Sequence, residues 1–255
     1  DPLWGTISFW LGKERRNLRW PEGSETWSDF GGRPSDENED PPHIAAREFW
    51  EETCAMLPYF PHDTIPRPGM EDIAESLRRD EYLFCVTMWT QTPNGEKRLF
   101  VTYVKQVPWT PAAYHSFQEA HQYLHKLRSQ AAAGALPCME EVLSVFPHPS
   151  ISIAPQVTIS KDFLEKKSIR MWSIPQLRTS IELQLLRERR DRERKRQHAA
   201  TTGPAATSGI FNRDIMARSI AMQQERFRSC FISIASTILK ELPLYEPRIH
   251  EIMRV

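Results

Sequence analysis

The chain has 255 residues, and its 33 basic and 33 acidic side chains give a formal net charge of zero. This length is enough to bury a full core in one domain and to carry an extension. A chain without net positive charge has no overall electrostatic attraction to nucleic acid. The sequence has no run of about 20 apolar residues, which excludes a membrane-spanning helix and argues against a membrane partner.

The cysteines are scattered along the chain and lack the paired spacing of metal ligands: Cys54, Cys85, Cys138 and Cys230. This pattern favours free thiols in a reducing, intracellular compartment over disulfides. We expect the cytoplasm. The chain starts with Asp1 and not with Met, so a targeting segment can be missing and an organelle stays open.

Two extended segments come first along the chain. Residues 5–14 predict a strand, and a second extended stretch at about 26–30 ends in Gly31 and Gly32. Two consecutive glycines permit a tight turn. A polar loop then leads to a helix that we expect from about residue 43 to about residue 56.

Three carboxylates share one face of this helix, because Glu48 lies three residues before Glu51 and four before Glu52. Like charges this close repel one another and weaken a bare helix, unless a cation offsets the repulsion. Hard oxygen ligands suit Mg²⁺ or Mn²⁺, so the spacing indicates a metal-dependent active site. The alternative is a solvated helix face with local ion pairs, such as Arg47 with Glu51.

The next elements are a hairpin and a helix. Residues 82–92 and 98–107 are β-rich and are joined by a turn segment with Pro93, Asn94 and Gly95. Residues 114–134 predict a helix whose apolar stripe belongs to the core: Phe117, Ala120, His121, Leu124 and Leu127. We expect the histidines of this helix to pack or to face solvent and not to bind zinc.

The last third of the chain predicts a strand, two helices and a linker. Residues 177–197 predict a helix that ends in a strongly basic stretch. Residues 164–175 resemble the late strand of a known hydrolase family, in which a Trp-Ser pair, here Trp172 and Ser173, precedes a helix. Small residues make about 198–209 a flexible linker. Residues 210–242 regain helical periodicity and predict an appendage that folds back on the preceding domain.

Residues 31–55 resemble the Nudix box of nucleoside-diphosphate-linked-moiety hydrolases. Gly32 supplies the glycine, Glu39 the first glutamate, and residues 47–52 the Arg-Glu-apolar-x-Glu-Glu core. The sequence departs from the family pattern twice. Six residues, not five, separate Gly32 from Glu39, and Cys54 replaces a glycine, so we expect the helix to end less sharply.

The resemblance covers about residues 1–180 and implies an α/β fold, the Nudix α/β/α sandwich around a mixed β-sheet. A helical insertion at about 111–145 and a C-terminal helical extension over 181–255 complete the expected organisation. The implied activity is metal-dependent hydrolysis of a diphosphate linkage with Mg²⁺ or Mn²⁺.

The resemblance also implies a role for each box residue. Arg47 orients a glutamate, and Glu51 or Glu52 contacts the metal-bound water. Glu165 is a further candidate base or ligand, with exposed surface charge as the alternative. The expected metal donors are the backbone carbonyl of Gly32 and the carboxylates of Glu39, Glu48, Glu51 and Glu52.

The segments 27–32 and 45–53 resemble Nudix proteins of large DNA viruses and some protists, a group that includes mRNA-decapping enzymes. An RNA 5′ end is therefore the expected substrate, through decapping or removal of pyrophosphate. Such a substrate needs stacking aromatics and a basic path, for which the candidates are Trp10, Trp27, Arg187 and Arg190. The alternatives are small nucleoside diphosphate derivatives such as dinucleoside polyphosphates, nucleotide sugars or diphosphoinositols, and an RNA-binding scaffold that docks a protein through its C-terminal helices.

Overall fold

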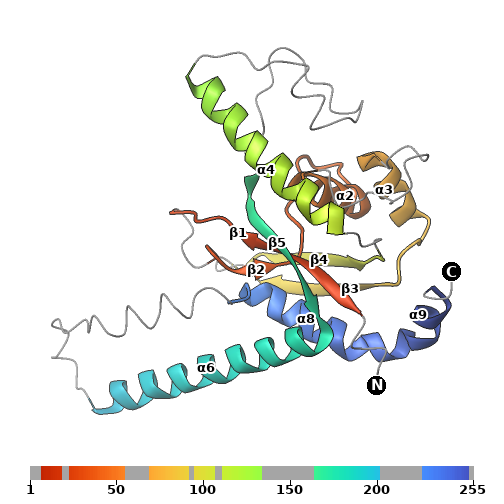
Figure 1. The fold of residues 1–255 in the computed structure, drawn as a ribbon. Helices are drawn as coiled ribbons and strands as arrows, with labels where there is room; N and C mark the ends of the chain where they lie inside the picture. The colour runs from red at the N-terminus through yellow and green to blue at the C-terminus, as the bar shows by residue number, and fades with distance from the viewer. Residues whose placement is uncertain are drawn as a thin grey trace. The chain divides into compact units, whose positions relative to one another are not determined.

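The computed structural model describes residues 7–18, 23–54, 69–91, 95–106, 111–133, 164–201 and 226–252. Within these ranges the protein is a mixed α/β chain in which helices accompany small antiparallel sheets (Figure 1). The expected α/β class is therefore confirmed. The finer assignment, a Nudix sandwich around one mixed sheet, stays a prediction.

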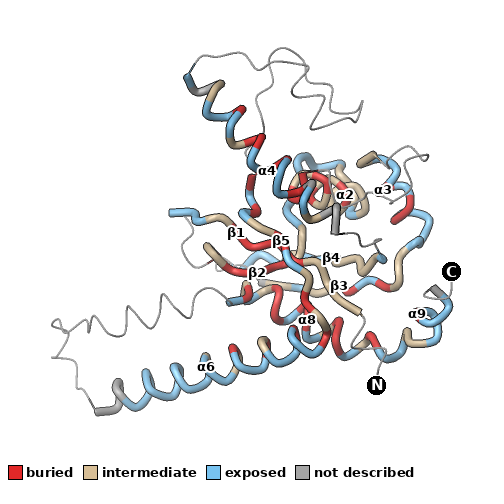
Figure 2. The backbone as a smooth tube through the Cα atoms, viewed as in Figure 1, coloured by how far each residue is buried: buried red, intermediate tan, exposed pale blue. Residues whose placement is uncertain are grey.

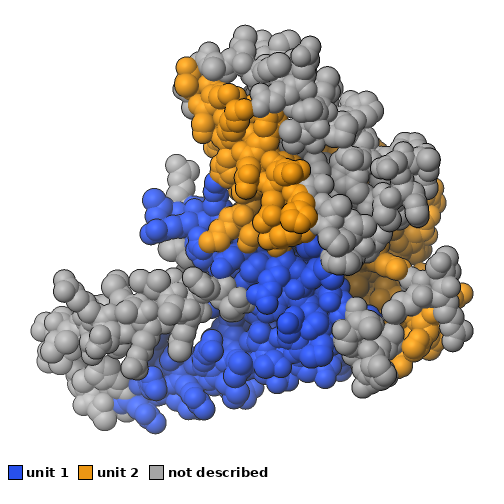
Figure 3. All heavy atoms as spheres, in the orientation of Figure 1, with its two compact units in different colours: residues 1–28, 170–240 blue, residues 29–169, 241–255 orange. Residues whose placement is uncertain are grey.

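Contacts divide the chain into two compact units (Figure 3). Unit 1 comprises residues 1–28 and 170–240, and unit 2 comprises residues 29–169 and 241–255. Each unit draws on both halves of the chain, whereas the sequence predicted one division near residue 180. The acidic box segment belongs to unit 2, and the basic stretch that starts at Arg187 belongs to unit 1.

Unit 1 is built on a short sheet with the strand order β2-β1-β5. In it, β1 (Ser8–Glu14) pairs antiparallel with β2 (Trp27–Ser28), and β5 (Lys166–Ser173) enters this unit at Arg170. Phe227 forms an isolated parallel β-bridge with Trp27. In this bridge the Trp27 N–H donates to the carbonyl of the preceding residue, Arg226, at 2.7 Å. A distant part of the sequence thus extends this sheet.

Two helices complete the described part of unit 1. The first, α6 (Ile174–Thr201), follows β5 without a loop, as the sequence predicted, and buries Ile174, Leu177 and Ile181. From Arg187 to Gln197 it is almost wholly exposed (Figure 2). The second, α8 (Ser229–Glu241), buries an apolar face. Residues 202–225, which include most of the expected linker, lie outside the described ranges.

The polar side chain of Gln184 connects α6 to the start of α8. Its Oε1 accepts a hydrogen bond from the Phe227 N–H at 2.7 Å, and its Nε2 donates to the Phe227 carbonyl at 3.0 Å. The Phe227 ring packs against Trp172 with centroids 5.0 Å apart. Phe227 therefore belongs to a strand-like segment, and the predicted helix over 210–242 begins only at residue 229 in the described part.

Unit 2 carries the acidic helix α2 (Pro41–Glu52), which packs against α3 (Met70–Arg78). Their shared core contains Ala46, Trp50, Ile73 and Ala74. Periodicity had placed α2 about two residues late at its start and four late at its end, and α3 was not predicted. Apolar contact between the two helices fixes the side of α2 that faces inward, and this leaves the glutamates on another side.

The predicted hairpin consists of β3 (Phe84–Gln91) and β4 (Lys97–Val104), paired in continuous antiparallel register. Trp89 stands opposite Leu99, and the two are 67% and 49% exposed, so this end of the hairpin presents an apolar surface. At its other end, Phe84 stacks on Tyr245 with ring centroids 4.5 Å apart. Tyr245 lies in the short helical turn η3 (Leu242–Tyr245), which precedes α9 (Glu246–Ile252).

The predicted insertion helix is α4 (Pro111–Ala132), which buries Phe117, Ala120, Leu124 and Leu127 as the sequence predicted. His121 lies between Phe117 and His125, with ring centroids 5.5 and 4.8 Å away. Residues 134–145 of the expected insertion lie outside the described ranges. Within those ranges, none of the helices is both long enough and apolar enough to cross a membrane.

Candidate functional site

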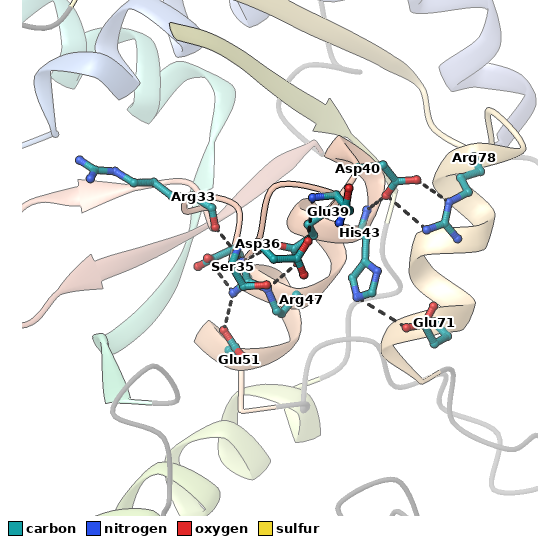
Figure 4. A network of polar contacts seen from close by, with 12 residues as sticks. Arg33, Ser35, Asp36, Glu39, Asp40, His43, Arg47, Glu51, Glu71 and Arg78 are labelled. Atoms are coloured by element: carbon teal, nitrogen blue, oxygen red, sulfur yellow. Dashed lines mark hydrogen bonds and ion pairs between the residues drawn. The ribbon is translucent and has the colours of Figure 1, made fainter. Parts of the chain in front are cut away.

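Asp40 fixes the start of α2. Its Oδ1 accepts the His43 N–H at 2.9 Å as an N-cap, and its carboxylate also receives Arg78 Nε at 2.8 Å (Figure 4). The hydrogen bond from Arg78 holds the pKa of Asp40 below its ordinary value, so the cap stays ionised at neutral pH. A negative cap also suits the positive end of the helix dipole. Because α3 supplies Arg78, the same contact ties the two helices together.

Arg47 is the centre of the acidic network (Figure 4). Its Nε donates to Glu39 Oε1 at 2.7 Å, and its Nη1 donates both to Glu48 Oε1 at 2.9 Å and to Glu51 Oε2 at 3.1 Å. Its Nη2 reaches the carbonyl of Arg33 at 2.8 Å. The hydrogen bond to Glu39 is the largest cause that raises the pKa of Arg47, so the guanidinium stays charged among three carboxylates.

Glu39 braces the loop before α2. Its side chain is only 4% exposed, and it accepts both Arg47 and the backbone N–H of Ser35. Burial by itself would raise the pKa of Glu39, but the hydrogen bonds from Arg47 and Ser35 outweigh it, and the pKa lies below its ordinary value. The ionised carboxylate therefore holds the loop on Arg47, eight residues further along the chain.

The backbone of Gly32 lies closer to the Glu48 carboxylate than any residue with a Cβ atom could lie without displacing it. A Cβ atom built at Gly32 would overlap the carboxylate of Glu48, whereas one at Gly31 would meet nothing within 4 Å. The glycine therefore lets the loop backbone lie directly against the Glu48 carboxylate. The backbone of Gly32 thus lies against Glu48, which shares Arg47 with Glu51.

Glu52 has a different environment from the other two glutamates. The residue is 2% exposed, its Oε1 lies 3.2 Å from Lys166 Nζ, and its Oε2 accepts the Gly31 N–H at 2.9 Å. The Lys166 side chain is 0% exposed and also donates to the carbonyl of Asp29 at 3.0 Å. A buried cation of the protein therefore neutralises the third carboxylate of the box.

Cys54 ends the helix sharply, contrary to our expectation. Its backbone adopts φ 53, in the left-handed region, and its N–H donates to the Glu51 carbonyl at 3.1 Å. This is the conformation that glycine usually supplies after a helix C-terminus. The thiol is fully buried, and burial raises its pKa to about 12, so the side chain is a poor nucleophile at neutral pH.

Of the remaining predicted residues, Glu165 belongs to unit 2 and the other four belong to unit 1. Glu165 is exposed and immediately precedes the buried Lys166. In unit 1, Trp10 is half-buried, and Trp27 is a 5% exposed core residue against Trp172. Trp27 therefore contributes to packing, and its ring is not available as a stacking platform in this arrangement. Two further predicted residues, Arg187 and Arg190, are exposed on α6 of unit 1.

Lys166 is the residue at this site that sequence reasoning missed. Lys166 and Asp29, which are in contact, lie 137 positions apart in the chain. The residues next to Lys166 give no sign that its side chain is buried against a partner. A lysine beside a second lysine is ordinarily read as surface charge. Only the folded structure brings its ammonium group to Glu52 of the acidic helix.

The residues present fit a divalent cation in donor chemistry. Glu48 Oε1 and Glu51 Oε2 both lie within 3.1 Å of one Arg47 nitrogen, and the Gly32 backbone adjoins Glu48. Among the described residues, no three acidic, histidine or cysteine side chains form a cluster that could hold a metal ion. Mg²⁺ does not require a cluster of three such side chains, because it is usually held by one or two carboxylates together with water and substrate phosphates.

Comparison of the chain with protein-family models, with curated proteins and with solved structures finds no match.

Proposed function

We propose that this chain is a metal-dependent hydrolase that cleaves a diphosphate linkage, with an RNA 5′ end as its substrate. The observation that supports this most is that Glu48 and Glu51 share Arg47 while Gly32 lies against Glu48, in the order of a Nudix box. A solvated charged face needs neither a buried arginine nor a glycine packed against a carboxylate. Here the Arg47 side chain is only 17% exposed.

The side chains divide the work as follows. Glu48, Glu51 and the Gly32 carbonyl are the donors for Mg²⁺ or Mn²⁺, and Arg47 orients both carboxylates. Glu39 holds Arg47 in place from the loop. When bound, the cation would neutralise phosphate charge and lower the pKa of a coordinated water. Arg47 is already shared by three carboxylates, so it positions these groups and is not free to bind a phosphate.

An RNA substrate is supported by two exposed features. In unit 2, the ring of Trp89 is 67% exposed, as a base-stacking platform must be. In unit 1, the part of α6 from Arg187 to Gln197 is almost wholly exposed and carries a surplus of basic over acidic side chains. Stacking rings together with a basic track are what single-stranded nucleic acid requires, whereas a small nucleotide needs only the first.

One observation favours a second function, that of an RNA-binding scaffold without catalysis. Each carboxylate of the box already has a cation of the protein as a partner, Arg47 or Lys166, without a metal ion. In a scaffold the same network would brace the fold while the basic half of α6 bound RNA.

The experiment that separates these functions is product release from capped RNA, 5′-triphosphate RNA and a panel of small nucleotides, with Mg²⁺ or Mn²⁺. Wild type and Glu51→Gln run side by side, with thermal unfolding as the control for folding. Turnover of RNA that Glu51→Gln lacks would support RNA 5′-end hydrolysis. Turnover of small nucleotides alone would replace the substrate, and RNA binding without turnover by either protein would establish the scaffold.

A further inference from the structure

Lys166 and Glu52 form a fully buried ion pair in unit 2. The Lys166 side chain is 0% exposed and that of Glu52 2%, with 3.2 Å between Nζ and Oε1. Removing two charges from water is costly, and their attraction offsets the cost only when further hydrogen bonds satisfy both groups. Here the structure supplies them, from the Gly31 N–H to Glu52 and from Lys166 to the Asp29 carbonyl.

These hydrogen bonds all end on the loop that precedes α2. Lys166, at the start of β5, donates to the Asp29 carbonyl, and Glu52, at the end of α2, accepts the Gly31 N–H. The two members of the pair therefore hold the same loop from two different elements. The next residue is Gly32, whose backbone lies directly against Glu48. The position of Gly32 at the Glu48 carboxylate therefore depends on the buried pair.

The environment of Glu52 also differs from that of a metal ligand. Glu48 and Glu51 share Arg47, whose side chain is 17% exposed, whereas Glu52 is matched to a lysine side chain that is 0% exposed. A divalent ion that took the place of Lys166 at Glu52 would have to displace an ammonium group that is buried with it.

We propose that Lys166 is a positioning residue of this site. Paired with Glu52, it fixes the loop that places Gly32 against Glu48, and Glu52 serves as its counter-charge and not as a ligand of the cation that Glu48 and Glu51 hold. The second part rests on the proposed function, because it concerns the same cation. The first part concerns the fold alone.

The test uses Lys166→Met, Glu52→Gln and the double variant, with Glu48→Gln as the matched control on the same helix. Each single variant leaves one buried charge without its partner and should lower the melting temperature by about 10 °C. The double variant removes both charges, and the amide oxygen of its new glutamine side chain can still accept the Gly31 N–H. Its melting temperature should return to within a few degrees of wild type, as expected for replacement of both members of a buried pair.

Mn²⁺ affinity, measured from the electron paramagnetic resonance signal of the free ion, separates a counter-charge at Glu52 from a direct metal ligand. The double variant should bind Mn²⁺ within about threefold of wild type, and Glu48→Gln at least about tenfold more weakly. A loss of about tenfold in the double variant at wild-type stability would make Glu52 a direct ligand and overturn the proposal.

The role of Lys166 in holding the loop and the role of Glu52 as its counter-charge are refuted by different results. If the single variants melt like wild type, Lys166 does not hold the loop, whatever the protein binds. If wild type binds no Mn²⁺ while the melting temperatures couple as expected, the proposed function fails and the positioning role of Lys166 in the fold stands.

Discussion

Replacing Gly32 by alanine tests the close approach at the centre of the site. The new methyl group would overlap the Glu48 carboxylate and push it away from Arg47, so that the 2.9 Å hydrogen bond is lost. A hydrogen bond to a charged group contributes about 1.5–3 kcal/mol to the free energy of unfolding. Replacing glycine by alanine offsets about 0.4–1 kcal/mol of this loss, because alanine restricts the unfolded chain. The expected net loss is about 1–2 kcal/mol, which corresponds to about 5 °C in melting temperature.

Gly31→Ala is the matched control for this substitution. It makes the same chemical change one residue earlier, where a Cβ meets nothing within 4 Å, and it keeps the N–H that binds Glu52. Thermal unfolding and Mn²⁺ titration of both variants are the assays. Gly31→Ala should be as stable as wild type or slightly more so and bind Mn²⁺ normally, whereas Gly32→Ala should lose at least about tenfold in Mn²⁺ affinity. Equal stability and equal Mn²⁺ affinity in the two variants would refute the reasoning.

Three further predictions concern the network and the thiols. Arg47→Lys keeps one charge but cannot bridge three carboxylates, so urea unfolding should show a loss of about 2 kcal/mol, and an unchanged midpoint would contradict the bridging role. The folded pKa of Glu39 lies below its ordinary value of 4.5, so its stabilising contribution is complete above that pH and is lost as the pH falls through the folded pKa. Glu39→Gln should therefore flatten the fall in melting temperature between about pH 5 and about pH 3, and an identical acid limb would exclude this contribution. In peptide mapping after alkylation, exposed Cys85 should react rapidly and buried Cys54 only on unfolding; rapid labelling of native Cys54 would contradict its burial.

The parts of this structure that the sequence predicts are those governed by local pattern. The three-and-four spacing of the glutamates, the apolar stripe of α4 and the strand that opens at Ser173 into α6 all depend on neighbours within a few residues. The hairpin likewise follows from two β-rich runs around a turn segment.

The parts that the sequence does not predict depend on distant partners. The bridge between Trp27 and residue 227 and the contact of Lys166 with Asp29 each join segments far apart in the chain. Cys54 shows a different limit. Glycine is the usual residue at φ 53, and only the packing around α2 shows that a buried cysteine is held there instead.

The most direct test of the central claim is hydrolysis of a 5′-triphosphate or capped RNA in ¹⁸O-labelled water with Mn²⁺. Attack of water on phosphorus would place one ¹⁸O atom in a phosphorylated product, as read by mass spectrometry, and Glu51→Gln should abolish the labelled product while keeping its melting temperature. Undiminished RNA binding by both proteins, without any labelled product from RNA or from small nucleotides, would contradict a hydrolase and leave the acidic helix as a structural brace.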